Sequence, residues 1–292
     1  MHWLIPIILT CLVGYILQPI LSKKIADLKS RTRNLCWQYF FAAIFANGIA
    51  LIGGFNYLED PRVIAIVVIG IFNAFGCYCY WRAIAVSLSK TSLFTQADDL
   101  SAMALGFLIL GEKQFLSSRL GIGITFAMVA VFLFAIANRQ VNGAFPKKKG
   151  LAIWIALYSF IWGAAIFSMR YFALGGMPLL NYVAGWYSGA LIGALIVFFL
   201  AGKTEAGQPL AMKDALRILP LSLTICASLM LGYWARTLAP LIVSQPIFQA
   251  AEMILPTAIG LWVFKEIKEL NLLSRIAIAV GLAGGITIAL SF

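Results

Sequence analysis

Long apolar segments fill most of this chain of 292 residues. A helix that crosses a membrane needs about 20 mostly apolar residues, so ten such segments leave room only for short connections. The expected spans are residues 3–21, 36–54, 62–80, 91–111, 119–137, 151–171, 178–201, 215–236, 243–264 and 273–291. Nothing remains for a catalytic or nucleotide-binding domain outside the membrane. The sequence therefore predicts an all-α integral membrane fold with ten transmembrane helices.

The composition excludes the other broad classes. The chain is 62% hydrophobic and 11% charged, whereas soluble domains have about 45–50% and 25%. Disordered chains lack this apolar content. The formal net charge is +11, but the basic residues lie between the apolar segments, where membrane insertion requires them. We therefore expect the lipid bilayer, and no nucleic acid, as a partner.

Histidine and cysteine limit the available chemistry. The only histidine is His2. The chain has five cysteines, most of them in apolar runs: Cys11, Cys36, Cys77, Cys79 and Cys226. An odd number of apolar cysteines does not make a disulfide framework, so we expect no metal site and no cofactor. The run from Trp3 to Leu21 lacks a basic flank and a cleavage site, and it is expected to be a retained span.

An internal duplication divides the chain into residues 1–137 and 151–292, joined by a basic linker at 138–150. A shift of 154 residues aligns Arg82 with Arg236, Asp98 with Glu252, Gly106 with Gly260, and Glu112 with Glu266. Each half holds five predicted spans. Because five is odd, the second half enters the membrane from the opposite face, as in the inverted repeats of many secondary transporters.

The basic residues predict an orientation. Connections after odd-numbered spans hold sixteen of them: Lys23, Lys24, Lys29, Arg31, Arg33, Lys90, Arg139, Lys147, Lys148, Lys149, Lys203, Lys213, Arg217, Lys265, Lys268 and Arg275. The opposite face holds five: Arg62, Lys113, Arg119, Arg170 and Arg236. The positive-inside rule then places both termini outside the cytoplasm.

The repeated stretches end in LGEK (Leu110–Lys113) and FKE (Phe264–Glu266). These stretches, with the span number and the duplication, resemble the drug/metabolite transporter superfamily, and within it the EamA-type ten-helix members. The family pattern has Gly-Glu after the fourth span of each half, whereas the second copy here reads Lys-Glu. The resemblance implies transport of amino acids, sugars, nucleotide precursors, quaternary amines or drugs, often coupled to protons. It also implies cytoplasmic termini, opposite to the charge count.

Acidic residues near the middle of two predicted spans are the leading candidates for a site. Asp98, Asp99 and Glu252 lie 8–10 residues inside their spans, where an ionised carboxylate costs about 2.5–3.5 kcal/mol. Such a group is expected to carry a coupling proton or to neutralise a cationic substrate. The alternative is a structural hydrogen bond or ion pair between helices. Because consecutive helical residues point about 100° apart, Asp98 and Asp99 are expected to face different neighbours.

Other polar residues share these helix faces. Thr95 lies near the two aspartates at helical spacing, and Gln245 and Gln249 form a stripe with Glu252. Arg82 and Arg236 are expected either to lie at the membrane interface or to attract an anionic substrate group.

Aromatic residues lie deep in four spans, at Tyr15, Tyr158, Trp162 and Trp186. Aromatic rings near a carboxylate suit an amine through cation–π attraction, and the alternative is ordinary packing. Gly185, Gly189 and Gly193 are spaced four residues apart, which predicts close helix packing.

Together these features predict a secondary transporter of a small polar metabolite, with amino acids and organic amines favoured. Proton coupling or exchange, alternating access, the cytoplasmic membrane and a monomer or homodimer are all expected. The alternative is a flippase for lipids or lipid-linked groups, and sugars and aromatic compounds remain open as substrates. An enzyme is not expected, because His2 is terminal and no zinc-protease motif is present.

Overall fold

The computed structural model describes residues 4–26, 30–54, 60–111, 117–141, 150–201, 212–266 and 271–290. Every regular element within these ranges is a helix. Three helical segments are interrupted. The first consists of α1 (Leu4–Leu12), the π-helical turn η1 (Val13–Leu17) and α2 (Gln18–Ala26). The second consists of α5 (Leu88–Phe94) and α6 (Gln96–Ile109), and the third of α13 (Leu241–Ala258) and the π-helical turn η4 (Ile259–Val263). The others are α3 (Arg31–Ile52), α4 (Arg62–Val86), α7 (Ser118–Val141), α8 (Leu151–Leu174), α9 (Leu179–Leu200), the short α11 (Met212–Leu216), α12 (Leu219–Leu238) and α14 (Leu272–Ala289).

Each predicted span coincides with one long helical segment of the described chain, so the all-α membrane fold is confirmed. Five of the described segments are long and apolar enough to cross a membrane by themselves: Leu4–Ile25, Arg31–Ile52, Arg62–Val86, Leu151–Leu174 and Leu179–Leu200. The hydropathy of the sequence located these helices well because lipid-facing residues remain apolar. Many large apolar side chains on the helices are exposed, such as Phe199 at 77% and Phe160 at 76%.

Two of the interruptions are π-helical turns associated with proline. In η1 the Gln18 N–H donates to the Val13 carbonyl, five residues back. Pro19 follows directly and has no N–H for the Tyr15 carbonyl, which accounts for the shifted register. In η4 the Phe264 N–H likewise donates to the Ile259 carbonyl at 3.2 Å, shortly after Pro256.

The chain folds into two compact units. Unit 1 comprises Met1–Trp81 and Ser168–Leu238, and unit 2 comprises Arg82–Phe167 and Ala239–Phe292. The boundary falls inside α4 and inside α8, so each unit draws helices from both halves of the sequence. This division by packing differs from the division by sequence at residues 138–150, and the two five-helix repeats stay a prediction.

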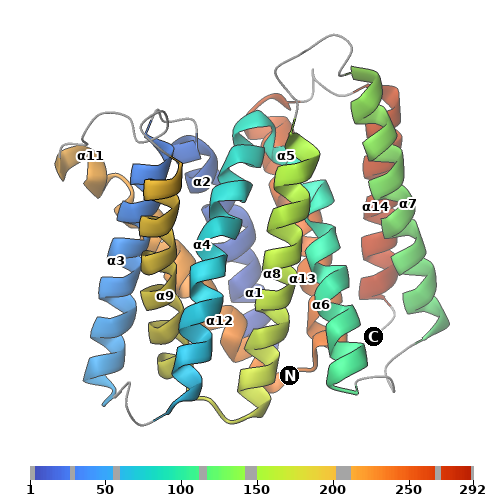
Figure 1. The fold of residues 1–292 in the computed structure, drawn as a ribbon. Helices are drawn as coiled ribbons and strands as arrows, with labels where there is room; N and C mark the ends of the chain where they lie inside the picture. The colour runs from blue at the N-terminus through green and yellow to red at the C-terminus, as the bar shows by residue number, and fades with distance from the viewer. Residues whose placement is uncertain are drawn as a thin grey trace. The chain divides into compact units, whose positions relative to one another are not determined.

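Within each unit, helices that the sequence comparison makes equivalent pack against one another. In unit 1, α3 packs along α9, and in unit 2, α7 packs along α14. The members of both pairs run in opposite directions, as the colour gradient in Figure 1 shows. Antiparallel packing of equivalent helices is what an inverted duplication produces.

Glycines set the contact between α9 and α4 in unit 1. A Cβ at Gly189 would lie under 3.0 Å from the backbone carbonyl of Val67, and one at Gly193 would meet Ile71 in the same way. A Cβ at Gly70 would in turn meet the backbone of α9 at Trp186. The predicted packing role of the glycine stripe on this helix is therefore confirmed for Gly189 and Gly193.

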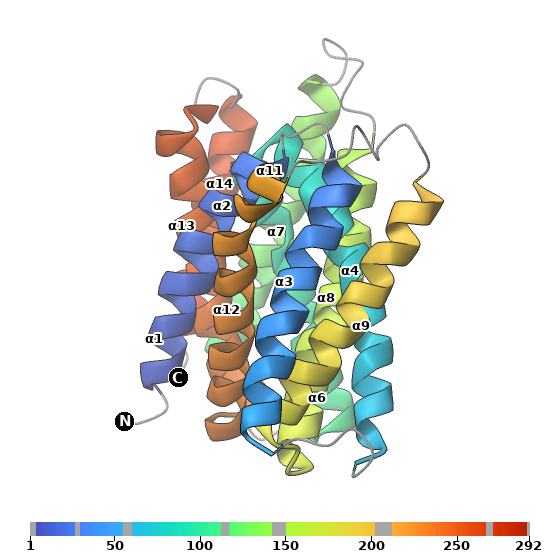
Figure 2. The ribbon, with the colours of Figure 1, turned by 90° about the vertical axis from the view of Figure 1, so that its left-hand side faces the viewer.

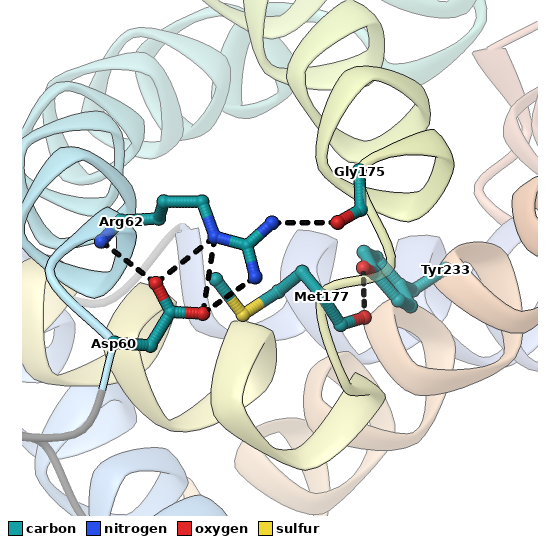
Figure 3. Close-up of polar contacts among 5 residues, drawn as sticks. All are labelled: Asp60, Arg62, Gly175, Met177 and Tyr233. Atoms are coloured by element: carbon teal, nitrogen blue, oxygen red, sulfur yellow. Dashed lines mark hydrogen bonds and ion pairs between the residues drawn. The ribbon is translucent and has the colours of Figure 1, made fainter.

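An ion pair holds the connection between α8 and α9 in unit 1 (Figure 3). The Asp60 carboxylate accepts from Arg62 Nε at 2.9 Å and Nη2 at 2.6 Å, and Arg62 Nη1 donates to the Gly175 carbonyl at 2.6 Å. The Tyr233 hydroxyl donates to the Met177 carbonyl at 2.7 Å. The Arg62 guanidinium holds the pKa of the Asp60 carboxyl below its ordinary value, so this pair weakens as pH falls through that lowered pKa.

Replacing Gly189 by alanine will destabilise unit 1, because the new Cβ forces α9 away from the backbone of α4. Overpacking of this kind costs about 1–3 kcal/mol. Thermal unfolding of the detergent-purified protein will show a lower midpoint than wild type. Gly48→Ala is the control, because nothing lies within 4 Å of a Cβ there. Equal midpoints for Gly189→Ala and wild type would contradict the close approach.

Candidate functional site

The fourth span is broken at Thr95, and this break creates the end of a helix inside the span. α5 ends at Phe94 and α6 begins at Gln96. Hydroxyl groups bond the local backbone here: Thr91 Oγ1 donates to the Ser87 carbonyl at 2.7 Å and Thr95 Oγ1 to the Ser92 carbonyl at 3.1 Å. Such bonds compete with regular helix geometry. The positive end of α6 therefore begins within the span.

Two carboxylates occupy the first turn of α6. Asp98 and Asp99 are both 0% exposed, and Asp98 Oδ1 accepts from the Asp99 N–H at 2.6 Å. A negative charge in the first turn of a helix is favourable because of the exposed N–H groups and the helix dipole. The break thus provides electrostatic stabilisation for acidic side chains buried in an apolar span.

α13 brings a third carboxylate to the same place. Glu252 is 8% exposed, and carboxylate oxygens of Asp98, Asp99 and Glu252 all lie within 4.8 Å of one another. We call these three residues the carboxylate cluster. The two aspartates have different hydrogen-bond partners, since Asp98 Oδ1 accepts from the Asp99 N–H and Asp99 Oδ1 accepts from Gln245 Nε2. One carboxylate oxygen of each nevertheless reaches the same cluster.

Glutamines on α13 complete the polar surface of the cluster. Gln245 Nε2 donates to Asp99 Oδ1, and Gln245, Gln249 and Glu252 share one helix face at i, i+4 and i+7. Gln249 is 1% exposed, yet neither amide atom has a hydrogen-bond partner among the described residues. Asp98 Oδ2 also has none in that part of the chain. Unsatisfied buried polar atoms are costly, so this face has spare capacity to bind a ligand.

The middle of α8 packs closely against the start of α6. Ser101 Oγ donates to the Asp98 carbonyl at 2.8 Å. A Cβ at Gly163 would lie 2.7 Å from that same carbonyl oxygen and would also meet Ser101 Oγ. Only glycine therefore allows α8 to approach α6 this closely.

The carboxylates of the cluster and the amides of Gln245 and Gln249 all belong to unit 2. Carboxylates and amide carbonyls match protons, ammonium groups and other hard cations. The expectation that the chain needs no metal stays a prediction. Beyond the cluster, the described charged residues on α5, on α14 and directly after η4 are Lys90, Arg275, Lys265 and Glu266.

The end of each repeated stretch has a structural role that the sequence indicated only in part. Glu266 accepts from Ser87 Oγ and from the Leu88 N–H, both at 2.9 Å. It therefore caps the start of α5. Its counterpart Glu112 lies outside the described residues. Gly111 has φ +69° and Lys265 has φ 57°, so both copies turn through left-handed backbone at this point.

Three further predicted residues lie in unit 2. Tyr158 and Trp162 on α8 stack with ring centroids 6.3 Å apart and an angle of 14° between planes. The Arg82 guanidinium lies 4.7 Å from the ring centroid of Trp154. Tyr158 and Trp162 share α8 with Gly163, which contacts the cluster helix, whereas Arg82 packs as a cation–π pair near the end of α4.

The remaining predicted residues lie in unit 1. Tyr15 is part of the π-helical turn η1 and is half-buried. Trp186 is 1% exposed and packs against Tyr182, with ring centroids 5.7 Å apart. Arg236 is 4% exposed, and its Nη1 donates to the Gly232 carbonyl at 3.0 Å. Arg170 donates to the Arg236 carbonyl at 2.6 Å. In the sequence this residue stands out only as one of the basic residues that bear on orientation.

The comparisons with known proteins agree with the fold and the sequence. The sequence model of the EamA-like transporter family matches residues 2–136. The resemblance to EamA-type transporters is confirmed. The match indicates a membrane transporter of the drug/metabolite type.

The structural comparison covers nearly the whole chain. One solved structure, described as the crystal structure of a protein, is 18% identical and covers 96% of this chain and 97% of its own, with a TM-score of 0.61. At that identity the likeness concerns the fold. No curated protein matches the sequence.

Replacing Gly163 by alanine will displace the first turn of α6 and disturb the carboxylate cluster. We expect any thermal stabilisation of the protein by a bound solute to fall, since the Asp98 backbone must move. Gly121→Ala on α7 is the matched control, because nothing lies within 4 Å of a Cβ there. A full ligand response in Gly163→Ala would show that the cluster does not depend on this contact.

Replacing Lys265 by glycine will stabilise the protein. A left-handed backbone costs a non-glycine residue about 1–2 kcal/mol, and glycine removes most of that cost. The reciprocal change, Gly111→Ala, should lower stability by a similar amount. Thermal unfolding of the two variants should give a higher midpoint for Lys265→Gly and a lower midpoint for Gly111→Ala than for wild type. Midpoints that move in the same direction would contradict the shared turn.

Proposed function

We propose that this chain is a secondary transporter that moves a small polar metabolite across the cytoplasmic membrane by alternating access. Amino acids and organic amines are the favoured substrates, and movement is coupled to protons or occurs by exchange. The single observation that carries the proposal is the carboxylate cluster of unit 2. The protein acts as a monomer or homodimer and is not an enzyme.

The charge of the cluster supports a cationic ligand. Three ionised carboxylates within 4.8 Å of one another would repel strongly in a water-poor interior, because Coulomb energy grows as the dielectric constant falls. Protons or an ammonium group neutralise them at this spacing. A substrate amine that replaces protons at the same carboxylates would link the two movements, which is the requirement for coupling.

The amides favour a substrate over a proton alone. Gln249 has a buried acceptor and two buried donors that find no hydrogen-bond partner in the part of the chain that the structure describes. A proton bound to a carboxylate does not satisfy an amide one helical turn away. An amine with an adjacent carboxylate or hydroxyl group supplies both partners, as amino acids do.

The helix break supports movement at the site. α5 and α6 are joined only through the turn at Thr95, and hinges in proteins are usually a few residues at element ends that absorb changes in backbone dihedrals. The π-helical turn η4 lies on the other helix of the site, and π-helical turns are frequent at functional sites. Tilting of α6 about Thr95 would open or close the cluster.

Transport in proteoliposomes will test the function directly. The full-length protein is reconstituted, a pH gradient is imposed, and uptake of radiolabelled amino acids, organic amines and sugars is measured with internal pH. We expect uptake of an amine or amino acid to depend on the gradient and to move protons with it. Asp98→Asn and Glu252→Gln should abolish this uptake, since each removes a carboxylate of the cluster.

Asp60→Asn is the matched control, because it removes an acidic group from unit 1 and leaves the cluster intact. Uptake that survives both cluster substitutions would remove the carboxylates from the mechanism. Failure of every soluble compound, together with movement of a fluorescent phospholipid between leaflets, would replace the proposal with the flippase alternative.

A further inference from the structure

The carboxylate cluster offers oxygen atoms that one small cation can reach together. Asp98 and Asp99 come from the first turn of α6, and Glu252 comes from the middle of α13. α13 packs against α5, α6 and α14, and Figure 2 shows α14 beside it. One carboxylate oxygen from each of the three residues lies within 4.8 Å of the other two. The three oxygens therefore lie around one small volume inside unit 2.

The spacing of these oxygens matches the size of a hard divalent cation. Calcium binds oxygen ligands at about 2.3–2.6 Å, so two ligands on opposite sides of the ion are about 4.6–5.2 Å apart. The three oxygens of the cluster fall inside that limit. Carboxylate and carbonyl oxygens also suit Mn²⁺. Mg²⁺ usually keeps several of its waters, and a site whose residues are 0%, 0% and 8% exposed favours an ion that exchanges them for protein ligands.

A buried amide is the second observation that points to an ion. Gln249 is 1% exposed, and neither atom of its amide has a hydrogen-bond partner among the described residues. It lies between Gln245, whose amide reaches Asp99, and Glu252, on the same face of α13. Its side chain is therefore directed toward the cluster. Oε1 can supply a fourth oxygen ligand, and Nε2 can donate to a water on the ion.

The charge of the site favours a divalent ion over a monovalent one. Asp98 is 0% exposed, and its Oδ2 has no hydrogen-bond partner in the described part of the chain. Three ionised carboxylates at this spacing repel one another strongly in a water-poor interior. A divalent cation leaves one negative charge, and the positive end of α6 offsets part of it. A monovalent ion such as Na⁺ would leave two.

We propose that Asp98, Asp99 and Glu252, together with Gln249 Oε1, bind one hard divalent cation such as Ca²⁺ or Mn²⁺. The sequence indicated no metal site because its histidine and cysteines are badly placed for one, but a site made of oxygen ligands needs neither. The ion shares its ligands with the proposed transport site, but metal binding does not rest on transport. A bound divalent cation and a substrate amine would exclude each other, because both neutralise the same carboxylates.

Titration of the full-length protein with Mn²⁺ alone will test the site. The protein is purified in detergent with a chelator, the chelator is removed, and free Mn²⁺ is followed by its electron paramagnetic resonance signal. We expect one Mn²⁺ bound per chain, displaced more readily by Ca²⁺ than by Mg²⁺ and not by Na⁺. Asp98→Asn and Gln249→Leu should each weaken binding about tenfold or more, since groups around a metal typically contribute that much to affinity.

Asp60→Asn and Gln38→Leu are the matched controls, because they remove a carboxylate and a buried amide from unit 1, and both should bind Mn²⁺ as wild type does. Gln249→Glu keeps an oxygen ligand and should retain the ion, and wild-type stoichiometry decides even if the cluster variants fail to fold. Absence of saturable binding by wild type, displacement by Na⁺, or equal binding by wild type and Gln249→Leu would overturn the proposal. The uptake assay contains no divalent metal, so its failure would reject transport and leave this site standing.

Discussion

Inside a membrane, a helix can be interrupted only where other groups satisfy the freed backbone N–H and carbonyl groups. The break at Thr95 is the place where this chain depends most on that constraint. Hydroxyls of Thr91, Ser92 and Thr95 satisfy nearby carbonyls. The Asp98 carboxylate accepts from an N–H of the first turn of α6. The interruption and the candidate site are thus one feature, since the Asp98 carboxylate both accepts from the backbone at the start of α6 and belongs to the carboxylate cluster.

The same constraint explains the left-handed backbone turn that both copies share at the end of the repeated stretch. The start of α5 would leave its own N–H groups exposed, and Glu266, from the other half of the sequence, accepts from the Leu88 N–H. For its side chain to reach, the chain must turn sharply after η4, which the positive φ of Lys265 provides. The departure from Gly-Glu to Lys-Glu therefore keeps the turn but adds backbone strain. Each unit is stabilised by such contacts between the two halves of the sequence.

Hydropathy predicted the helices well because burial in lipid leaves a direct mark on composition. The 154-residue shift also paired Asp98 with Glu252, and the two carboxylates do meet in unit 2. Other features left no such mark. The break at Thr95 depends on hydroxyl–backbone bonds that compete with a regular helix only in this context. The mixing of both halves within each unit depends on tertiary packing. Helical spacing also does not show that one oxygen of Asp98 and one of Asp99 reach the same cluster.

Equivalent positions in the two halves have acquired different surroundings, and this difference has a functional consequence. Arg82 lies over the ring of Trp154, whereas Arg236 is buried and bonds the Gly232 carbonyl of its own helix. Asp98 sits in the first turn of a new helix, whereas Glu252 lies in the middle of α13, between glutamine and proline. A duplicated scaffold with identical sites would bind a ligand in two equivalent orientations. With a helix N-terminus on one side and amides on the other, the cluster would distinguish the two ends of the substrate proposed above. That asymmetry suits a molecule with an ammonium group at one end and a hydrogen-bonding group at the other.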